Sequence, residues 1–220
     1  MTITLQIKYM RNIALFLFYI IFIPVVSAQE MNSPVKHGID VNFGVPSGLK
    51  PGDKAPDFTA HDTEGNKVSL VNELKNGPVV IIFYRGQWCP VCNRYLSNFQ
   101  DSLVYLINAG AKVLAITPEK PINAVKMIEK TGATFTVLPD PTEQIMRSYE
   151  VIFNVTEAYQ QKIQNRFEVD IAISNAKTEA MLPVPATFII NRQGVIVYRQ
   201  FNLDYHHRAS VKDILDNLPQ

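Results

Sequence analysis

The feature that most constrains this chain is a pair of cysteines placed between a buried strand and a helix. Cys89 and Cys92 follow the apolar, largely β-branched run 79–84 after a short turn. From Tyr95 to Ile107, apolar residues then recur at intervals of three and four, which is the spacing of an amphipathic helix. A strand, a tight turn and a helix that opens on Cys-x-x-Cys indicate a redox-active dithiol.

The position of Cys89 at the start of a helix favours its ionised form. Unpaired backbone N–H groups and the positive end of the helix dipole stabilise a thiolate there and lower its pKa. Cys92 lies one turn further along, close enough to form a disulfide with Cys89. Pro90 suits the first helical turn, where its missing N–H costs nothing. A purely structural disulfide is the weaker interpretation, because so short a loop restrains little unfolded chain.

Composition indicates a globular protein with one ordinary domain. The chain has 220 residues, of which 47% are hydrophobic and 19% charged. Its net charge is +1 and it contains no basic block, so we expect no nucleic-acid partner.

The N-terminal stretch has the pattern of an export signal. Two cations precede the apolar run 13–26, which ends in a small-residue cleavage pattern at Ala28. We therefore expect 1–28 to be a signal peptide and the mature protein to be periplasmic or secreted. An uncleaved N-terminal membrane anchor is the alternative, although the run is shorter than the roughly 20 residues that a span needs. Residues 29–48 are predicted to be a flexible mature N-terminus.

Strands and helices alternate through the predicted domain, 49–220, which indicates a central parallel-type sheet with helices on both faces. The predicted strands are 79–84, 111–117, 134–138, 186–191 and 195–201, with a small hairpin over 59–69. Gly110 and Gly132 are expected to end helices. Segment 151–181 interrupts the alternation, and helical spacing within it predicts a helical insertion that covers the site.

Two capping boxes predict further helices. Asp140 and Glu143, with Pro141 between them, predict a helix to about Tyr149. Ser210 and Asp213 predict a C-terminal helix.

Three segments together resemble a known family. Residues 52–58 (GDKAPDF), 84–92 (YRGQWCPVC) and 183–194 (PVPATFIINRQG) are similar to the alkyl hydroperoxide reductase/thiol-specific antioxidant (AhpC/TSA) group. More narrowly, they resemble its peroxiredoxin-like branch, in which the first cysteine of Cys-x-x-Cys is the nucleophile. The resemblance spans about 49–218. It implies a thioredoxin-like α/β fold, with a central mixed sheet flanked by helices and an insertion before a cis-Pro strand. In that fold a cis Val184–Pro185 bond would face the cysteines.

The site departs from the peroxiredoxin pattern in three places. Peroxiredoxins carry Thr or Ser three residues before the reactive cysteine, where this chain has Gly86, and Pro seven residues before it, where this chain has Ile82. Their activating Arg corresponds to Pro185. Those groups hold the peroxide for attack. Arg85 is a candidate substitute, with a solvated or sheet-edge charge as the alternative.

Other residues resemble thioredoxin. Trp88 before the first cysteine and Pro185 opposite it fit the thioredoxin pattern. The buried Asp that accepts the proton in thioredoxins corresponds to Phe83, so proton handling is unassigned.

These residues predict a thiol-dependent oxidoreductase without a cofactor. Cys89 would attack an oxidised sulfur and Cys92 would resolve the mixed disulfide, with a thioredoxin-like or other thiol as the reductant. The alternative is a thioredoxin-dependent peroxidase, in which Cys89 attacks a hydroperoxide and Cys92 resolves the sulfenic acid.

A metal-binding module is the interpretation from another class. Cys89 and Cys92 would supply two ligands, and His206 and His207 two more. The histidines lie far from the cysteines in sequence and no second cysteine pair exists, so the prediction is that no metal is bound.

Overall fold

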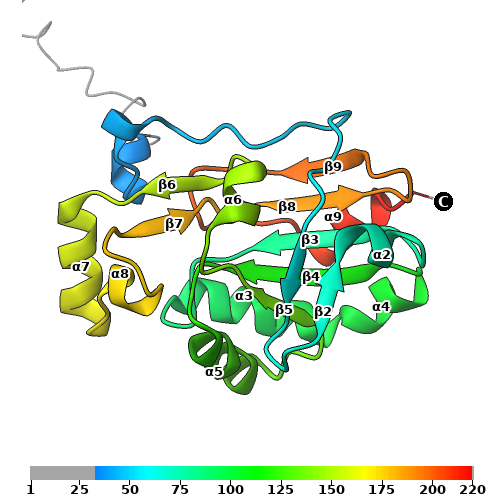
Figure 1. Ribbon diagram of the computed structural model, residues 1–220, viewed down its shortest axis with the longest axis horizontal. Helices are drawn as coiled ribbons and strands as arrows, with labels where there is room; N and C mark the ends of the chain where they lie inside the picture. Colours follow the sequence, from blue (N-terminus) through cyan, green and yellow to red (C-terminus); the bar gives the residue numbers. More distant parts are fainter. Residues whose placement is uncertain (1–32, 220) are drawn as a thin grey trace, which may run out of the picture. The chain divides into compact units, whose positions relative to one another are not determined.

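A five-stranded mixed sheet lies at the centre of the computed structural model, which describes residues 33–219 (Figure 1). The strand order is β5-β4-β3-β8-β9. The strands are β3 (Val79–Phe83), β4 (Lys112–Thr117), β5 (Thr136–Pro139), β8 (Thr187–Ile190) and β9 (Ile196–Gln200). Strands β3, β4 and β5 are parallel, whereas β8 and β9 are antiparallel to their neighbours. The predicted mixed sheet and its five strands are therefore confirmed, while the expected signal peptide, 1–28, lies outside the described residues.

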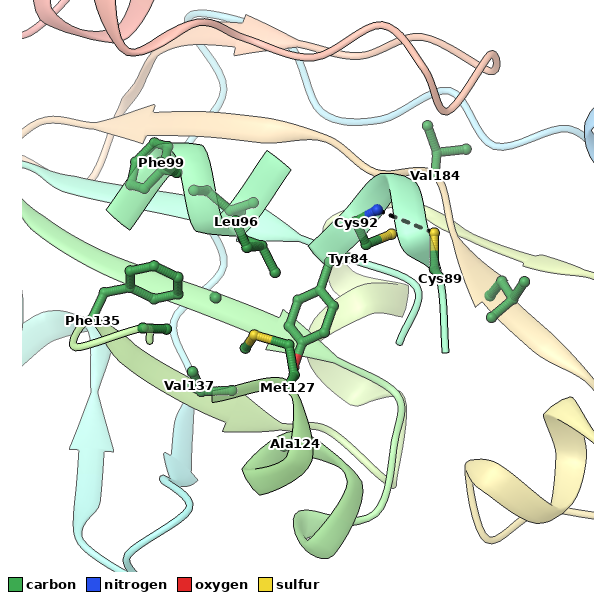
Figure 2. Close-up of a cluster of buried hydrophobic side chains, with 14 of the residues drawn as sticks. Tyr84, Cys89, Cys92, Leu96, Phe99, Ala124, Met127, Phe135, Val137 and Val184 are labelled. Atoms are coloured by element: carbon green, nitrogen blue, oxygen red, sulfur yellow. Dashed lines mark hydrogen bonds between the residues drawn. The ribbon is translucent and has the colours of Figure 1, made fainter. Parts of the chain in front are cut away.

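The sheet separates two hydrophobic cores, because successive side chains of a strand point to opposite faces. Ile82 and Tyr84 pack in the first core with the two cysteines, and Ile81 and Phe83 pack in the second. Figure 2 shows part of the first core, where the cysteine turn lies over buried aromatic and aliphatic side chains. The continuous apolar run of β3 is thus the signal of a strand buried on both faces.

Helices cover both faces of the sheet (Figure 1). The first core contains side chains of α3 (Pro90–Asp101), α4 (Leu103–Asn108), α5 (Pro121–Thr131) and α9 (Val211–Asp216), together with side chains of the insertion. The helices contributing to the second are α2 (Leu70–Leu74) and α6 (Gln144–Ser148), beside the hairpin of β1 (Thr59–His61) and β2 (Lys67–Ser69). Within 33–219, no helix has the length and apolar character needed to cross a membrane.

The insertion contains strands as well as the predicted helices. Strand β6 (Ile152–Asn154) pairs antiparallel with β7 (Met181–Pro183), and α7 (Glu157–Phe167) and α8 (Ile171–Ser174) lie between them. The predicted helical insertion is therefore confirmed in α7 and α8, and the structure adds the β6–β7 strand pair, which the sequence analysis missed. The second half of the insertion is polar and irregular and gave no sign of a strand, because β7 is specified by its pairing with β6.

The N-terminal segment is packed where the structure describes it. Short 3₁₀ helices η2 (Pro34–His37) and η3 (Val41–Phe43) flank Ile39, which is fully buried and forms a bridge to Val155. The description of 29–48 as flexible therefore does not hold around Ile39.

The two predicted capping boxes have different outcomes. Ser210 and Asp213 form a complete box at the start of α9, which confirms that prediction. The box at Asp140 is wrong, because α6 begins only at Gln144. Asp140 still continues the strand, with its N–H bonded to Thr117, and its carboxylate accepts a hydrogen bond from the N–H of Met146 at 3.0 Å.

The expectation of a cis Val184–Pro185 bond was wrong. No peptide bond among the described residues is cis. The N–H of Val184 donates to Val151 at 2.7 Å, and the carbonyl of Ala186 accepts from the N–H of Phe83 at 2.9 Å. These bonds keep the chain extended as it passes from the β6–β7 pair into the central sheet, and a trans bond suits that path.

Candidate active site

The turn after β3 places Cys89 at the N-terminus of α3, as the sequence predicts. Cys89 is the N-cap residue, Pro90 is the first helical residue, and the N–H of Cys92 donates to Cys89 Sγ at 3.3 Å. Both cysteines are free thiols and both are fully buried. The helix N-terminus therefore supplies one donor directly to the first sulfur.

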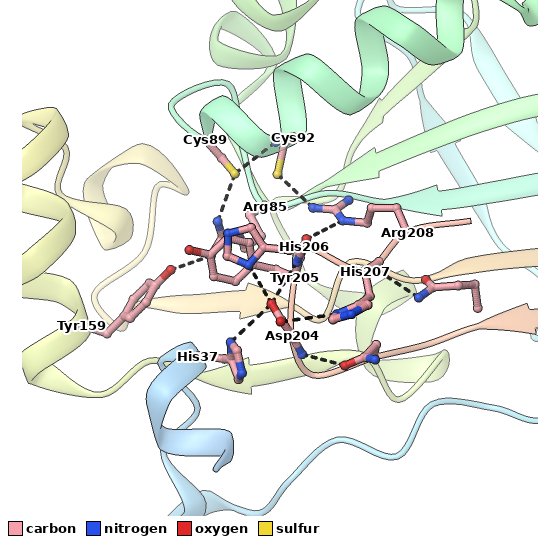
Figure 3. A network of polar contacts seen from close by, with 12 residues as sticks. His37, Arg85, Cys89, Cys92, Tyr159, Asp204, Tyr205, His206, His207 and Arg208 are labelled. Carbon is pink, nitrogen blue, oxygen red and sulfur yellow. Dashed lines mark hydrogen bonds and ion pairs between the residues drawn. The ribbon is translucent and has the colours of Figure 1, made fainter. Parts of the chain in front are cut away.

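Arg85 lies directly against the first sulfur (Figure 3). Its Nη2 donates to Cys89 Sγ at 3.0 Å, and its Nη1 donates to the hydroxyl of Tyr159 on α7 at 2.6 Å. The guanidinium also lies over the ring of Tyr205, 3.5 Å from the ring centre. Arg85 is only 3% exposed, which excludes the alternative of a solvated or sheet-edge charge.

A second arginine, which the sequence analysis missed, lies against the second sulfur. Arg208 Nη2 is 3.5 Å from Cys92 Sγ, and its guanidinium lies 5.3 Å from the centre of the Tyr95 ring. More than a hundred residues separate Arg208 from Cys92, so no local spacing could have linked them.

The two thiols and two guanidinium groups form one electrostatic unit. Burial raises the pKa of Cys89 well above its usual value, and contact with Cys92 adds to that rise, whereas Arg85 opposes it. Burial also opposes ionisation of Cys92, but the hydrogen bond from Cys89 and the charges of Arg208 and Arg85 hold the pKa of Cys92 well below its usual value. The lowered pKa that the sequence predicts for Cys89 is thus found at Cys92. Because the two sulfurs are in contact, the pair ionises as one unit whose negative charge both guanidinium groups stabilise.

Glu119 is a buried carboxyl group beneath the turn. It is fully buried, and its two oxygens accept hydrogen bonds from the N–H of Gln87 at 2.6 Å and from Ser174 Oγ at 3.0 Å. Burial raises the pKa of Glu119 to about 7. The sequence analysis missed it, although it lies two residues beyond the predicted strand that ends at Thr117. Because the carboxyl ends of parallel strands meet at one sheet edge, that position was a usable signal.

Gly86 occupies a position where no side chain fits. A Cβ atom there would lie 2.5 Å from Trp88 Nε1 and 2.7 Å from Glu119 Cδ. Trp88 is itself 5% exposed, and its Nε1 has no hydrogen-bond partner among the described residues. The indole and the carboxyl group thus fill the space where the resemblance leads one to expect a Thr or Ser side chain.

Pro185 is buried in the link between β7 and β8. Its neighbour Val184 packs in the same core as Cys89 and Cys92, beside the cysteine turn in Figure 2. The structure therefore brings this link to the site, without the cis bond.

The two histidines of the metal alternative face a carboxylate and not the cysteines. The Nδ1 atoms of His206, His207 and His37 lie 2.7, 3.3 and 3.7 Å from the carboxylate of Asp204 (Figure 3). Within residues 33–219, no group of three or more His, Cys, Asp or Glu residues could hold a metal ion. The metal alternative thus has no support in this part of the chain.

A buried Cys-x-x-Cys at the start of a helix, on a mixed sheet of this order, defines a thioredoxin-like thiol oxidoreductase. The chain belongs to the AhpC/TSA family, whose model matches residues 51–199. It is therefore an oxidoreductase with a thiol-dependent redox site.

Curated relatives agree with this class. The chain is 29% identical over 155 residues to a putative peroxiredoxin of Mycobacterium tuberculosis, covering 70% of this chain and 87% of the relative. It is 32% identical over 103 residues to peroxiredoxin Bcp of Escherichia coli, covering 47% and 65% respectively.

The solved structures show the same fold. Peroxidoxin BcpB from M. tuberculosis has a TM-score of 0.59 at 20% identity, covering 77% of this chain and 96% of that one. A putative thiol:disulfide interchange protein DsbE from Chlorobium tepidum has a TM-score of 0.53 at 24% identity, covering 76% and 94%.

Proposed function

We propose that this protein is a thiol peroxidase in which Cys89 reduces a hydroperoxide and Cys92 resolves the product. The observation that carries the proposal is the hydrogen bond from Arg85 to the sulfur of a fully buried Cys89. A small peroxide needs less space at a buried sulfur than the disulfide of a folded protein does. The sequence favoured disulfide exchange because Gly86, Ile82 and Pro185 replace peroxiredoxin residues and because Trp88 and Pro185 fit the thioredoxin pattern. Arg85, which donates to the sulfur, supplies a donor that those replacements lack.

The first step forms a sulfenic acid. The Cys89 thiolate attacks the distal peroxide oxygen, so that an S–O bond forms and the O–O bond breaks. The departing alkoxide takes a proton from the neighbouring Cys92 thiol or from solvent and leaves as an alcohol, or as water from hydrogen peroxide. Cys89 loses two electrons and the peroxide gains them.

The second step forms the disulfide. The Cys92 thiolate attacks the sulfenic sulfur of Cys89, the S–S bond forms, and the hydroxyl group leaves as water after gaining a proton. An external thiol, of the thioredoxin-like or another kind, then reduces the disulfide by two exchange steps. The spacing of one helical turn suits this intramolecular attack.

The two arginines have separate roles in this scheme. Arg85 stabilises negative charge on Cys89 and presents a donor to the peroxide oxygen on which charge develops. Arg208, beside Cys92, stabilises the thiolate that attacks in the second step. Since burial does not neutralise a guanidinium group, both remain donors throughout the cycle.

Thiol–disulfide exchange is the second candidate. Its support is that Cys89 is the N-cap residue of α3, with Trp88 directly before it and the partner thiol one turn away. The same dithiol would then attack a disulfide sulfur, with Cys92 releasing the mixed disulfide.

Stopped-flow fluorescence separates the two candidates, because Trp88 is the single tryptophan and lies next to the dithiol. The reduced protein is mixed with hydrogen peroxide or with a small disulfide, and Cys89→Ser and Cys92→Ser serve as controls. The proposal predicts that the peroxide reacts faster and that the reaction needs Cys89. A faster reaction with the disulfide would favour the second candidate.

A further inference from the structure

A small pocket beside the dithiol is lined by four arginine and lysine side chains. It has a volume of about 250 Å³ and lies between the start of α3 and helix α7 of the insertion. The cations are Arg85, Arg94, Lys162 and Arg166, and no Asp or Glu lines the pocket. Four permanent charges of one sign around so small a volume create a strong field for an anion.

Three of these cations are free to bind a ligand. Arg94, Lys162 and Arg166 are exposed, and none forms an ion pair with another residue in the described part of the chain. Arg85 joins the pocket to the reacting sulfur, since it lines the pocket and donates to Cys89. The Nε of this buried guanidinium has no hydrogen-bond partner among residues 33–219.

The remaining lining is largely apolar and aromatic. Lys162 Nζ lies 5.8 Å from the centre of the Tyr159 ring, and the Arg166 guanidinium lies 5.4 Å from that of Phe167. Such contacts hold the charged ends of flexible side chains over ring faces. The other lining residues are Pro90, Val91, Ile163, Tyr205 and His206. The pocket thus combines an apolar wall with cations at its edge.

We propose that this pocket selects hydroperoxides that carry a carboxylate on a compact apolar or aromatic body. The proposal rests on the peroxidase function above and names the class of substrate. The carboxylate binds among Arg94, Lys162 and Arg166, the apolar body packs on Phe167 and Ile163, and the peroxide group points toward Arg85 and Cys89. Helix α7, which belongs to the insertion, therefore confers substrate preference on the site.

The test compares two hydroperoxides that differ only in charge: cumene hydroperoxide and its para-carboxylated analogue. The selectivity is the ratio of their kcat/KM values with the full chain. The pocket variant is Lys162→Gln/Arg166→Gln. The matched control is Lys50→Gln/Lys126→Gln, which removes two exposed lysines that do not line the pocket.

We expect the native protein to prefer the carboxylated peroxide, and the preference to fall about tenfold in the pocket variant, the effect of losing roughly 1.4 kcal/mol of binding. The control variant keeps the native ratio and the native rate with hydrogen peroxide. Raising the salt concentration reduces the preference of the native protein, because exposed charges are screened.

An equal ratio in the pocket variant and the native protein would overturn the proposal. A second result would also overturn it: no preference among peroxides, but faster reduction of the oxidised protein by a carboxylate-bearing thiol than by the amide of that thiol. The pocket would then bind the reductant and not the peroxide.

The failure of the peroxidase function would look different. In that case no peroxide reacts, but the anionic disulfide dithiobis(nitrobenzoate) reacts faster than neutral dithiodipyridine with the native protein and loses this advantage in the pocket variant. The hydroperoxide substrate would then be wrong, while selection of anions by the pocket would stand.

Discussion

At the scale of single residues, the site depends on a buried arginine whose negative partner is a thiolate. Arg85 is nearly inaccessible and forms no ion pair with a carboxylate among the described residues. Although burial opposes it, the charges of Cys89 and Cys92 raise the pKa of Arg85, so the guanidinium stays charged. Arg85 and the dithiol therefore stabilise each other's charges.

This dependence predicts the effect of removing the guanidinium. Arg85→Met should slow the reaction of Cys89 with hydrogen peroxide by about 100-fold. This is the usual effect of removing one hydrogen-bond donor from an atom on which negative charge develops in the transition state. The measurement is the stopped-flow rate constant at pH 7. Arg94→Met is the matched control, since Arg94 lines the pocket without contacting either sulfur. Equal rates for the two variants would contradict the assigned role.

Glu119 predicts how stability depends on pH. Burial raises the pKa of Glu119 from 4.5 to about 7, so the folded state binds this proton more tightly than the unfolded state. The stabilisation is complete below pH about 4.5 and is lost as pH rises through about 7, by about 3 kcal/mol in all. Glu119→Gln removes this dependence and keeps an acceptor for Gln87.

The measurement is urea unfolding of the reduced protein at pH 5.5 and pH 8. We expect Glu119→Gln to gain stability relative to the native protein as the pH rises. Asp140, whose pKa burial also raises, to about 6, contributes equally in both proteins and cancels from the comparison. A difference that stays constant between the two pH values would show that Glu119 does not titrate in this range.

At the scale of elements, the turn between β3 and α3 is the most constrained segment. Gly86 lies so close to Trp88 and to Glu119, which follows the end of β4, that a Cβ atom at this position would overlap both side chains. The peroxiredoxin-type hydroxyl is therefore absent for a packing reason. The carboxyl of Glu119, bonded to the N–H of Gln87, fixes the turn in its place.

A glycine pair tests this packing. Gly86→Ala should destabilise the protein by about 1–3 kcal/mol, because the new methyl group overlaps the indole and the carboxyl group. Gly110→Ala is the control: it also has a positive φ, of 77°, but nothing lies within 4 Å of its Cβ. The midpoint of thermal unfolding is measured for both variants. An equal decrease in the two midpoints would mean that backbone strain alone, and not the overlap with Trp88 and Glu119, destabilises Gly86→Ala.

The sequence predicted correctly those elements that are determined by residues close together in the chain. The apolar run of β3, the N-cap at Cys89 and the box at Ser210 depend on residues a few positions apart, and all three are observed. The predicted start of α6 was wrong. Asp140 continues strand β5, and its carboxylate accepts a hydrogen bond from the N–H of Met146 instead of capping a helix that begins at the next residue. Strand β7 was missed because only its partner β6 specifies it.

At the scale of the whole molecule, the site is assembled from segments far apart in sequence (Figure 3). His37 from the N-terminal segment, Tyr159 from the insertion and 204–208 from the C-terminal region gather around the turn at Arg85. Sequence reasoning identified the two cysteines, Trp88 and Arg85 because they share that turn. It could not find Arg208 or Tyr205, because only the tertiary fold brings the segment after β9 next to Cys92 and Arg85.

In the proposed cycle Cys89 attacks the peroxide and Cys92 resolves the product, and mass spectrometry of trapped sulfenic acid distinguishes these two roles. Reduced Cys92→Ser is treated with one equivalent of hydrogen peroxide and a sulfenic-acid reagent, and Cys89→Ser is treated in parallel. We expect the added group on Cys89 in the first variant, little modification of Cys92 in the second, and an intramolecular disulfide in the native protein. Modification of Cys92 as fast as that of Cys89 would contradict the account.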